Sequence, residues 1–310
     1  MKKLKKILKW IGLVLLVLIA SISAITASRQ DLKFTAEYPS IKASTDSNVI
    51  ARGKHIVYDI AHCSACHSNA NSDSLLKLGL DVPLSGGRKF ALPVGNIYSK
   101  NITPDKEHGI GKYSDGEIAR ILRFGVHADG TAVFDFMPFH NMSDEDLTAV
   151  ISYLRVQKPV SDIVPSHELN PIGNVLKAFM VKPVGPKGIV PVSVKSDTTA
   201  TYGAYLVNSL ANCGGCHTTR DMSGAFVGEP FAGGGPMDHG LVPPNITPDS
   251  SSRIFGWSQQ AFISRFRMGK VIPNSPMPWN SFKRMSDDEL KAIYNYLQTV
   301  KPAKTALVKK

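Results

Sequence analysis

The chain has 310 residues, of which 43% are hydrophobic and 20% are charged; this length and composition provide for about two folded domains and exclude a largely disordered protein. The formal net charge is +11, but five of the 36 basic residues lie within the first nine positions. The other 31 only slightly outnumber the 25 acidic residues, and they form no stripe with aromatic side chains. We therefore expect no nucleic-acid partner.

Residues 1–30 differ in character from the rest of the chain. After the N-terminal lysines, Trp10–Ser28 is an uncharged run of 19 residues, which as a helix spans about 28 Å and can cross the hydrocarbon layer. Lysines before the run favour a cytoplasmic N-terminus and place the following domains on the periplasmic face of the cell membrane. We expect an uncleaved membrane anchor. The alternative is a cleaved signal peptide, for which the small residues of SISAITAS offer no A-x-A site.

The remainder of the chain contains one unit twice. Met142–Pro159 and Met285–Pro302 align without a gap over 18 positions, nine of them identical, and both the pentapeptide NITPD and a Met-Pro pair occur upstream of each. This order of features predicts a duplicated domain. The predicted boundaries are a connecting segment at 31–48, a first domain at 49–160, a proline-rich linker at 161–196 with one or two helical turns near 174–181, a second domain at 197–303 and a basic tail at 304–310.

Each unit is predicted to be mainly helical, with one helix before the first cysteine and another over the aligned segment. Ser143 and Ser286 are expected N-caps of the final helices, and an acidic residue three positions later gives a capping-box pattern. A methionine before each cap and a leucine four residues after it are predicted to form hydrophobic staples. These pairs are Met142 with Leu147 and Met285 with Leu290.

The four cysteines lie in two copies of C-x-x-C-H, CSACH at 63–67 and CGGCH at 213–217. Two C-x-x-C pairs can in principle form one zinc site, and C-x-x-C alone can be a redox disulfide, although the βαβ context of thioredoxin-like proteins is absent. Neither explains a histidine after both pairs. C-x-x-C-H is the spacing for covalent haem attachment, in which the thiols bind the porphyrin and the histidine binds the iron. We therefore predict two haem c groups, bound by Cys63, Cys66, Cys213 and Cys216, with His67 and His217 as proximal ligands.

A distal iron ligand must come from elsewhere in each unit. Met137 and Met277 occupy equivalent places, and each is followed by proline. A thioether ligand suits electron transfer because methionine–histidine ligation raises the reduction potential. We predict Met137 and Met277 as distal ligands; the alternatives are packing methionines with an open site, or a histidine. The rival histidines have no counterpart in the other unit; they are His55, His62, His108, His127, His140, His167 and His239.

These motifs, CSACH and CGGCH with NITPD, MPF or MPW and the final helix in the same order, resemble tandem cytochrome c domains. The resemblance is to the cytochrome subunits of membrane-bound alcohol and gluconate dehydrogenases. It implies an all-α chain with two class I cytochrome c domains after the N-terminal transmembrane helix. It also implies one haem held by Cys63, Cys66, His67 and Met137, and another by Cys213, Cys216, His217 and Met277. The best-known subunits of this type carry three haem units, whereas this chain has two motifs.

The expected function is electron transfer without substrate chemistry of its own. The chain would take electrons from a membrane dehydrogenase or a quinol-linked donor and pass them to an oxidase or a small cytochrome. The alternative is a haem enzyme, either a dihaem peroxidase or a sulfur-compound dehydrogenase. Catalysis at haem requires an exchangeable distal position or a special ligand such as cysteine, and the sequence has no further cysteine.

Two pairs of smaller features have open interpretations. Arg123 and Arg267 align, and a guanidinium at this place either holds a haem propionate together with the aligned Tyr113 and Trp257, or packs as an ordinary side chain. The sequences Asn101-Ile-Thr and Asn245-Ile-Thr match the glycosylation pattern. The following proline and the repeated position favour a turn instead.

Overall fold

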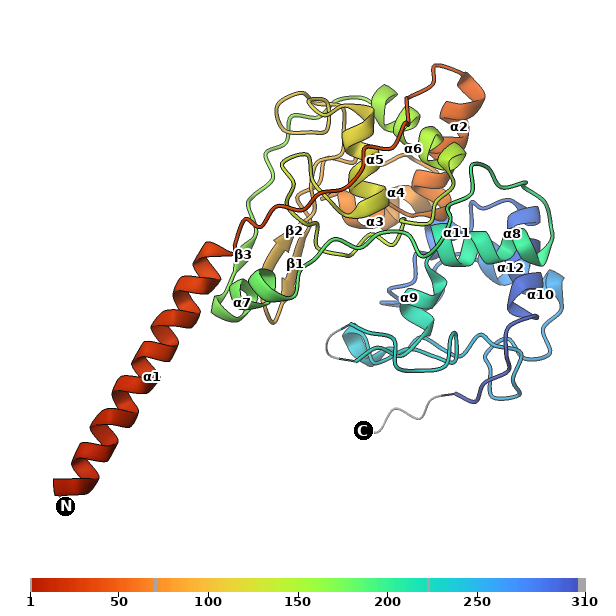
Figure 1. The fold of residues 1–310 in the computed structure, drawn as a ribbon. Coiled ribbons are helices and arrows are strands. Elements are labelled where there is room, and N and C mark those ends of the chain that lie inside the picture. Colours follow the sequence, from red (N-terminus) through yellow and green to blue (C-terminus); the bar gives the residue numbers. More distant parts are fainter. Residues whose placement is uncertain (1, 70–71, 222–223, 306–310) are drawn as a thin grey trace.

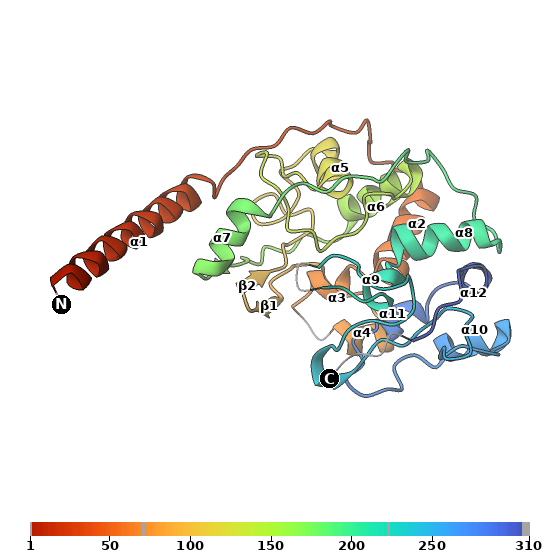
Figure 2. The same cartoon turned by 60° about the horizontal axis from the view of Figure 1, so that its bottom comes forward.

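The computed structural model describes residues 2–69, 72–221 and 224–305. Helix α1 (Lys2–Ser28) projects from a folded body, and the two halves of that body lie side by side (Figures 1 and 2). The predicted basic tail at 304–310 falls mostly outside the described residues. Within the described residues, α1 is the one helix long and apolar enough to cross a membrane, a test that signal sequences also pass.

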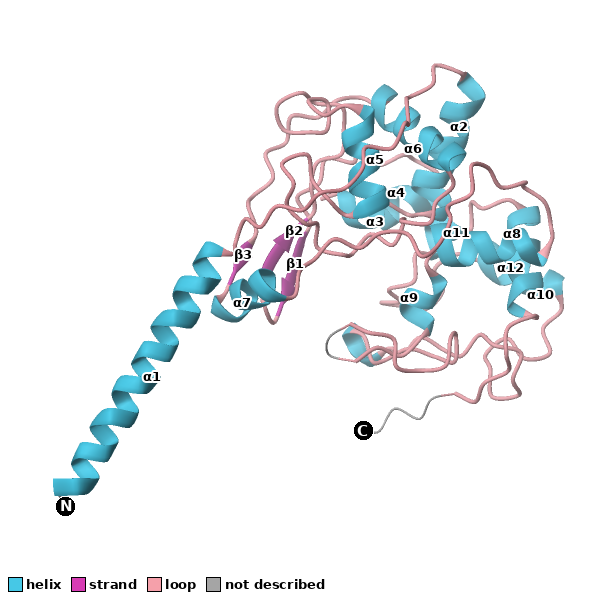
Figure 3. Cartoon of the chain, in the orientation of Figure 1, coloured by secondary structure: helices cyan, strands magenta, loops and turns pink. Residues whose placement is uncertain are grey.

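The regular elements are mostly helices, and the two halves contain them in a similar order (Figure 3). The first half comprises α2 (Ser47–His55), the π-helix η1 (Ile56–Ile60), α3 (Ser64–His67), α4 (Ser72–Lys77), α5 (Asp115–Phe124) and α6 (Asp144–Val156). The second comprises α8 (Ala200–Tyr205), the π-helix η2 (Leu206–Leu210), α9 (Cys213–His217), the 3₁₀ turn η3 (Asp238–Gly240), α10 (Gln259–Arg267), α11 (Trp279–Phe282) and α12 (Asp287–Leu297).

A small antiparallel sheet departs from the predicted all-α fold. Its strands β1 (Lys89–Leu92), β2 (Gly95–Tyr98) and β3 (Glu168–Leu169) are paired in the order β1-β2-β3. The hairpin belongs to the first half, whereas β3 comes from the proline-rich linker. The linker then forms α7 (Pro171–Phe179), close to the predicted helical turns. The linker is therefore packed against the first half and is not simply an extended connection.

The first and last helices of each half cross at a glycine. A Cβ atom on Gly53 of α2 would lie 1.9 Å from the carbonyl oxygen of Ala149 on α6, and a Cβ atom on Gly203 of α8 would lie 1.9 Å from that of Ala292 on α12. Only glycine allows two backbones to approach so closely. Large apolar side chains fill the surrounding core, among them Ile56, Leu147, Ile151, Leu206, Leu210 and Leu290.

The predicted caps are present, with one difference between the halves. Ser286 and Glu289 form a reciprocal capping box. Ser143 accepts a hydrogen bond from the Asp146 backbone N–H, but the Ser143 backbone N–H donates to the hydroxyl of Tyr205 instead of to Asp146. The Asp146 carboxylate is occupied by Arg52, which donates to both of its oxygens at 2.9 and 3.2 Å. Both staple methionines are buried, as predicted.

A buried charged cluster joins the two halves. Arg52 and His55 on α2 both contact Glu289 on α12, at 3.2 and 2.8 Å. The other ring nitrogen of His55 lies 2.7 Å from Asp59, which also pairs with Arg284 of the second half at 2.7 Å. Buried charges are tolerated only when they are paired and hydrogen-bonded, so this cluster favours one arrangement of the halves.

A second contact between the halves lies next to the first C-x-x-C-H motif. The ring of His62, which directly precedes Cys63, meets the ring of Phe282 on α11 edge to face at 5.5 Å. Asp73 on α4 accepts hydrogen bonds from Asn280 at 2.8 Å and from Lys270 at 2.9 Å. The loop that contains Met277 therefore continues into a helix that packs against the first motif.

Candidate haem-binding sites

Each C-x-x-C-H motif follows a buried helix and forms one short helical segment of its own. The residue before the first cysteine is in the left-handed region in both copies, His62 with φ 41° and Asn212 with φ 51°. This turn redirects the chain from the π-helix into α3 or α9. Cys66 and Cys216 are exposed, whereas Cys63 and Cys213 are partly buried. The helical turn places both cysteines and the histidine of a motif within five consecutive residues, as a shared binding group requires.

The histidine of each motif is held by the same type of hydrogen bond. Nδ1 of His67 lies 2.7 Å from the carbonyl oxygen of Lys100, and Nδ1 of His217 lies 2.7 Å from that of Pro244. A carbonyl oxygen accepts only, so Nδ1 carries the proton and Nε2 keeps its lone pair. Within residues 2–69, 72–221 and 224–305, neither Nε2 has a hydrogen-bond partner. Fixing Nδ1 in this way is the usual outer-shell arrangement of a metal-binding histidine.

The protonation of these groups also suits a ligand role for the histidines. Burial lowers the pKa of His67 and His217, so both are neutral near pH 7. Burial raises the pKa of Cys63 and Cys213 to about 12. A redox-active pair needs an accessible thiolate and therefore a lowered thiol pKa. Among the described residues, no group of three or more His, Cys, Asp or Glu side chains is arranged to hold a metal ion, so the four thiols do not converge on one zinc site.

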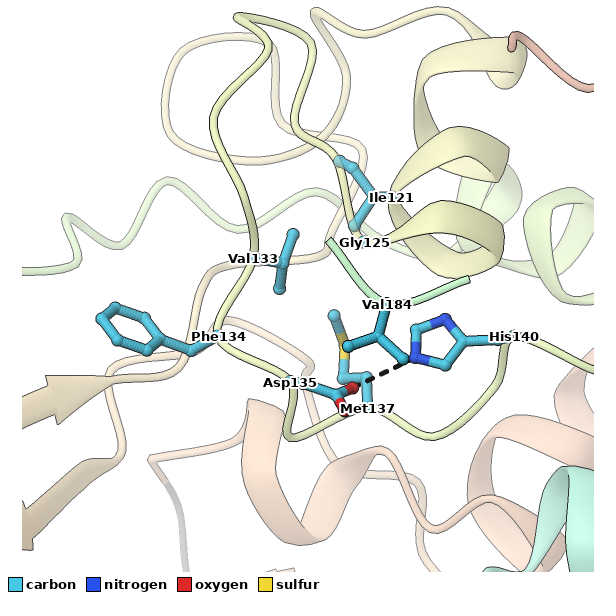
Figure 4. Close-up of a pocket in the computed structure, with 8 residues that line it drawn as sticks. All are labelled: Ile121, Gly125, Val133, Phe134, Asp135, Met137, His140 and Val184. Atoms are coloured by element: carbon cyan, nitrogen blue, oxygen red, sulfur yellow. Dashed lines mark hydrogen bonds and ion pairs between the residues drawn. The ribbon is translucent and has the colours of Figure 1, made fainter. Parts of the chain in front are cut away.

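Met137 lies in the loop that leads to α6. Figure 4 shows its side chain beside Val184, which comes from the linker, with Val133 nearby. His140 lines the same small pocket, and its Nε2 lies 3.1 Å from Asp135. Met137 is partly buried against the core. Nε2 of the rival ligand His140 is thus held by a carboxylate, and among the described residues its buried Nδ1 has no hydrogen-bond partner. A carboxylate on one ring nitrogen is also found behind metal-binding histidines, so Met137 and His140 both stay candidate ligands in this half.

Met277 occupies the corresponding loop of the second half. It is partly buried, and its carbonyl oxygen accepts a hydrogen bond from the backbone N–H of Trp279 at the start of α11. The Trp279 ring stacks under the guanidinium of Arg265 at 3.6 Å. The two Met-Pro loops thus have different surroundings, a carboxylate–histidine pair in the first half and an arginine–tryptophan pair in the second.

The aligned arginines pack against the backbone of their own half. Arg123 is buried and donates to the carbonyl oxygens of His140 and Met142, at 3.2 and 2.5 Å, and to Asp144 at 2.7 Å. Arg267 donates to the carbonyl oxygen of Lys283 and to Asp287. Both guanidinium groups join the end of the Met-Pro loop to the first turn of the last helix. The packing interpretation of these arginines agrees with the structure.

The NITPD segments are turns with the same internal bonds. Asn101 and Asn245 are buried, and each side-chain oxygen accepts from the backbone N–H of the threonine two residues later. Their amide groups donate to backbone carbonyls just after the final helix of the same half, Val160 and Ala303. A buried, fully bonded asparagine is no glycosylation acceptor, so the turn interpretation holds.

The carbonyl groups that hold the two histidines were not predicted. Lys100 and Pro244 each directly precede the NITPD segment, so the repeated motif fixes the position of the preceding carbonyl as well as its own turn. The identity of the side chain at that position is unimportant because only the backbone is used. Two dissimilar residues therefore perform the same role, and a comparison of side chains alone does not reveal it.

The C-terminal half matches a known family. Residues 200–301 fit the family model of cytochrome c. These residues form a cytochrome c domain. Such a domain implies a covalently bound haem c, for which C-x-x-C-H is the attachment motif.

Relatives extend the resemblance over most of the chain. The cytochrome subunit of fructose dehydrogenase from Gluconobacter japonicus is 32% identical over 277 residues, covering 84% of this chain and 54% of that protein. The cytochrome c subunit of a quinone-type alcohol dehydrogenase from Gluconobacter oxydans is 30% identical over 279 residues, covering 82% of this chain and 55% of that protein. A diheme cytochrome c-type protein of Cereibacter sphaeroides is 26% identical over 266 residues, covering 81% of this chain and 85% of that protein.

The predicted resemblance to cytochrome c subunits of dehydrogenases is thus confirmed. The chain spans about half the length of the fructose and alcohol dehydrogenase subunits.

Proposed function

We propose that the chain is a membrane-anchored dihaem c-type cytochrome that carries electrons and performs no substrate chemistry. The observation that carries the proposal is the equivalence of the two histidines. Each follows a C-x-x-C pair and donates from Nδ1 to a backbone carbonyl at 2.7 Å, and among the described residues its Nε2 has no partner. Since the second half is a cytochrome c domain, the same arrangement in the first half supports a second one there.

Further equivalences support one haem in each half. The helix crossings at Gly53 and Gly203 have the same geometry, and the NITPD turns make the same bonds. We assign Cys63, Cys66, His67 and Met137 to one haem, and Cys213, Cys216, His217 and Met277 to the other. When bound, haem c supplies an iron that changes oxidation state by one electron at a potential set by its axial ligands.

The chain's own residues hold this group and tune it. The cysteines would form the covalent links, and the carbonyls of Lys100 and Pro244 orient the histidines. Arg123 donates to two backbone carbonyls at the end of the Met137 loop and to Asp144 on the first turn of the last helix, which restricts the movement of the loop that carries the methionine. A methionine fixed in this way favours electron transfer over catalysis because an exchangeable distal position would have to open.

The donor and the acceptor are proposed from the relatives. The relatives are named as cytochrome subunits of fructose, alcohol and gluconate dehydrogenases, and these names support a membrane dehydrogenase or a quinol-linked protein as the electron donor. An oxidase or a small cytochrome would accept the electrons. We further propose that α1 anchors the chain in the cell membrane with both halves on the periplasmic side, since five lysines precede its apolar run.

The experiment that tests the proposal counts covalent haem groups. The variant Cys63→Ala with Cys66→Ala should keep one haem, as measured by intact mass and by haem-stained gels, and Cys213→Ala with Cys216→Ala should keep the other. Two remaining haems in either double variant would contradict the assignment. Rapid cyanide binding by the wild-type chain would instead favour a haem enzyme with an open distal position.

A separate measurement tests the anchor. The full chain should remain in the membrane fraction after a carbonate wash. Recovery as a soluble periplasmic protein that lacks its first residues would identify the N-terminal segment as a cleaved signal peptide.

A further inference from the structure

Helix α7 has its apolar residues on the outside. Ile172, Val175 and Phe179, at helical spacing i, i+3 and i+7, are 66%, 37% and 42% exposed. Met180, directly after the helix, is also exposed. A helix on the surface of a soluble protein normally turns such a stripe toward the core and its polar residues toward water. Within the part of the chain that the structure describes, the exposed stripe on α7 therefore lacks the packing partner that its composition requires.

The other side of α7 carries small residues and is closely packed. A Cβ atom on Gly173 would lie 2.1 Å from the carbonyl oxygen of Val94, and Ala178 is buried. Asn170 caps the helix by accepting from the Gly173 backbone N–H at 2.9 Å and donates to the Pro93 carbonyl at 2.8 Å. The close approach at Gly173 and the bond from Asn170 hold α7 against the β1–β2 hairpin in one orientation. The outward direction of the large apolar side chains is thus fixed by packing.

The helix also lies against the end of the proposed membrane span. Both views place α7 beside the C-terminal end of α1 (Figures 1 and 2). Directly after the apolar run, Arg29 donates from Nε to the Ala178 carbonyl and Gln30 donates to the Asn174 carbonyl, each at 3.0 Å. Thr26, on the last turn of α1, is buried. These contacts hold α7 at the C-terminal end of the proposed membrane span.

Two basic side chains lie near the C-terminal end of the apolar stripe. The Arg29 guanidinium lies 5.1 Å from the centre of the Phe179 ring. Lys182, which is exposed, follows the helix, whereas Lys177 lies on the opposite side of α7, 3.9 Å from Asp31. Apolar residues with arginine and lysine at their margin are typical of helices that lie in the headgroup region, where the cations contact lipid phosphates.

We propose that α7 is an interfacial helix, with Ile172, Val175, Phe179 and Met180 inserted into the outer leaflet of the bilayer beside α1. This inference rests on the proposed membrane span. With two elements in the membrane, rotation of the folded body about the axis of α1 is restricted. The face of the first half that carries β1, β2 and β3 is then directed toward the membrane surface.

The test is the accessibility of an introduced cysteine to a membrane-impermeant maleimide. Val175→Cys is compared with Ile189→Cys, which replaces a fully exposed residue of the same linker, in the full haem-loaded chain. The wild-type chain gives the background. In vesicles of phosphatidylcholine and phosphatidylglycerol, labelling at position 175 should be at least about tenfold slower, since apolar burial withdraws the reactive thiolate. Complete labelling of both variants after denaturation shows that each cysteine is available.

Three outcomes would overturn the inference, and they are distinguishable. Equal labelling rates in a chain that stays in the membrane would refute the interfacial helix alone. Slow maleimide labelling at position 175 in spheroplasts, but not in vesicles that contain the purified chain, would assign the apolar stripe to a protein partner. Recovery of the chain in the soluble fraction, with equal labelling at both positions, would refute the anchor and the interfacial helix together.

Discussion

Replacing the crossing glycine Gly53 by alanine should destabilise the first half of the protein. The added methyl group would lie 1.9 Å from the carbonyl oxygen of Ala149, whereas ordinary contacts begin at 3.4 Å. Helices α2 and α6 must therefore separate by roughly 1.5 Å, or α2 must bend. The obstacle is backbone within a helix, which cannot rotate away as a flexible side chain can.

The magnitude follows from two opposing contributions. Overpacking of a close contact costs about 3 kcal/mol where the neighbour cannot yield. Alanine in a helix is favoured over glycine by about 1 kcal/mol. The net loss in the free energy of unfolding should be about 2 kcal/mol. Gly203→Ala meets the carbonyl of Ala292 at the same distance and should cost a similar amount in the second half.

Urea denaturation of the full chain, followed by circular dichroism, measures this change. The matched control is Gly116→Ala in α5, where the new methyl group meets its nearest neighbour at an ordinary 3.6 Å. The control should be neutral or stabilising by about 0.5 kcal/mol, because alanine reduces the entropy of the unfolded chain. If Gly53→Ala behaves like Gly116→Ala, the close helix crossing does not exist in solution.

Three further predictions concern the ligands, the charged cluster and the loop arginine. Met277→Ala should lower the reduction potential of one haem by on the order of 200 mV, because methionine ligation lies at the high end of the range of haem potentials. Met285→Ala should mainly cost about 3 kcal/mol of stability. A redox titration in which only Met285→Ala shifts a potential would reverse the ligand assignment. For His55, burial lowers the pKa, but the hydrogen bonds to Asp59 and Glu289 and their charges raise it to about 9, above the unfolded value near 6.5. The raised pKa of His55 therefore contributes on the order of 3 kcal/mol to the free energy of unfolding; this contribution is fully present below pH 6.5 and is lost as the pH rises through 9. The melting temperatures of wild type and His55→Gln should converge at high pH. A difference that stays constant with pH would contradict this. Arg123→Ala should destabilise the chain by about 3 kcal/mol, since three hydrogen bonds of a buried guanidinium are lost, while Arg267→Ala, whose side chain is 36% exposed, should cost less in the same denaturation assay.

The sequence by itself determined the features that depend on neighbouring residues. Ser143 and Ser286 cap the last helices because a serine side chain reaches the backbone three residues on, whatever surrounds it. The turn at NITPD forms in both halves because the asparagine and the threonine bond each other locally. The C-x-x-C-H spacing has a chemical meaning before any fold is known, and the cytochrome c family match of residues 200–301 agrees with it. The haem ligands themselves stay predictions.

Only the tertiary structure decided which distant groups meet. Asp146 has the spacing to complete a capping box, yet it binds Arg52 and the Tyr205 hydroxyl, which are brought to it by α2 and by the other half. The linker at 161–196 has the prolines of an extended segment, but β3 pairs with β2 and α7 packs on the β1–β2 hairpin, leaving an apolar stripe outside. Local conformational preferences act over a few neighbouring residues. Hydrogen bonds and close packing between distant residues depend on how the chain folds back on itself, and that arrangement is set by the summed burial of apolar side chains in both cores.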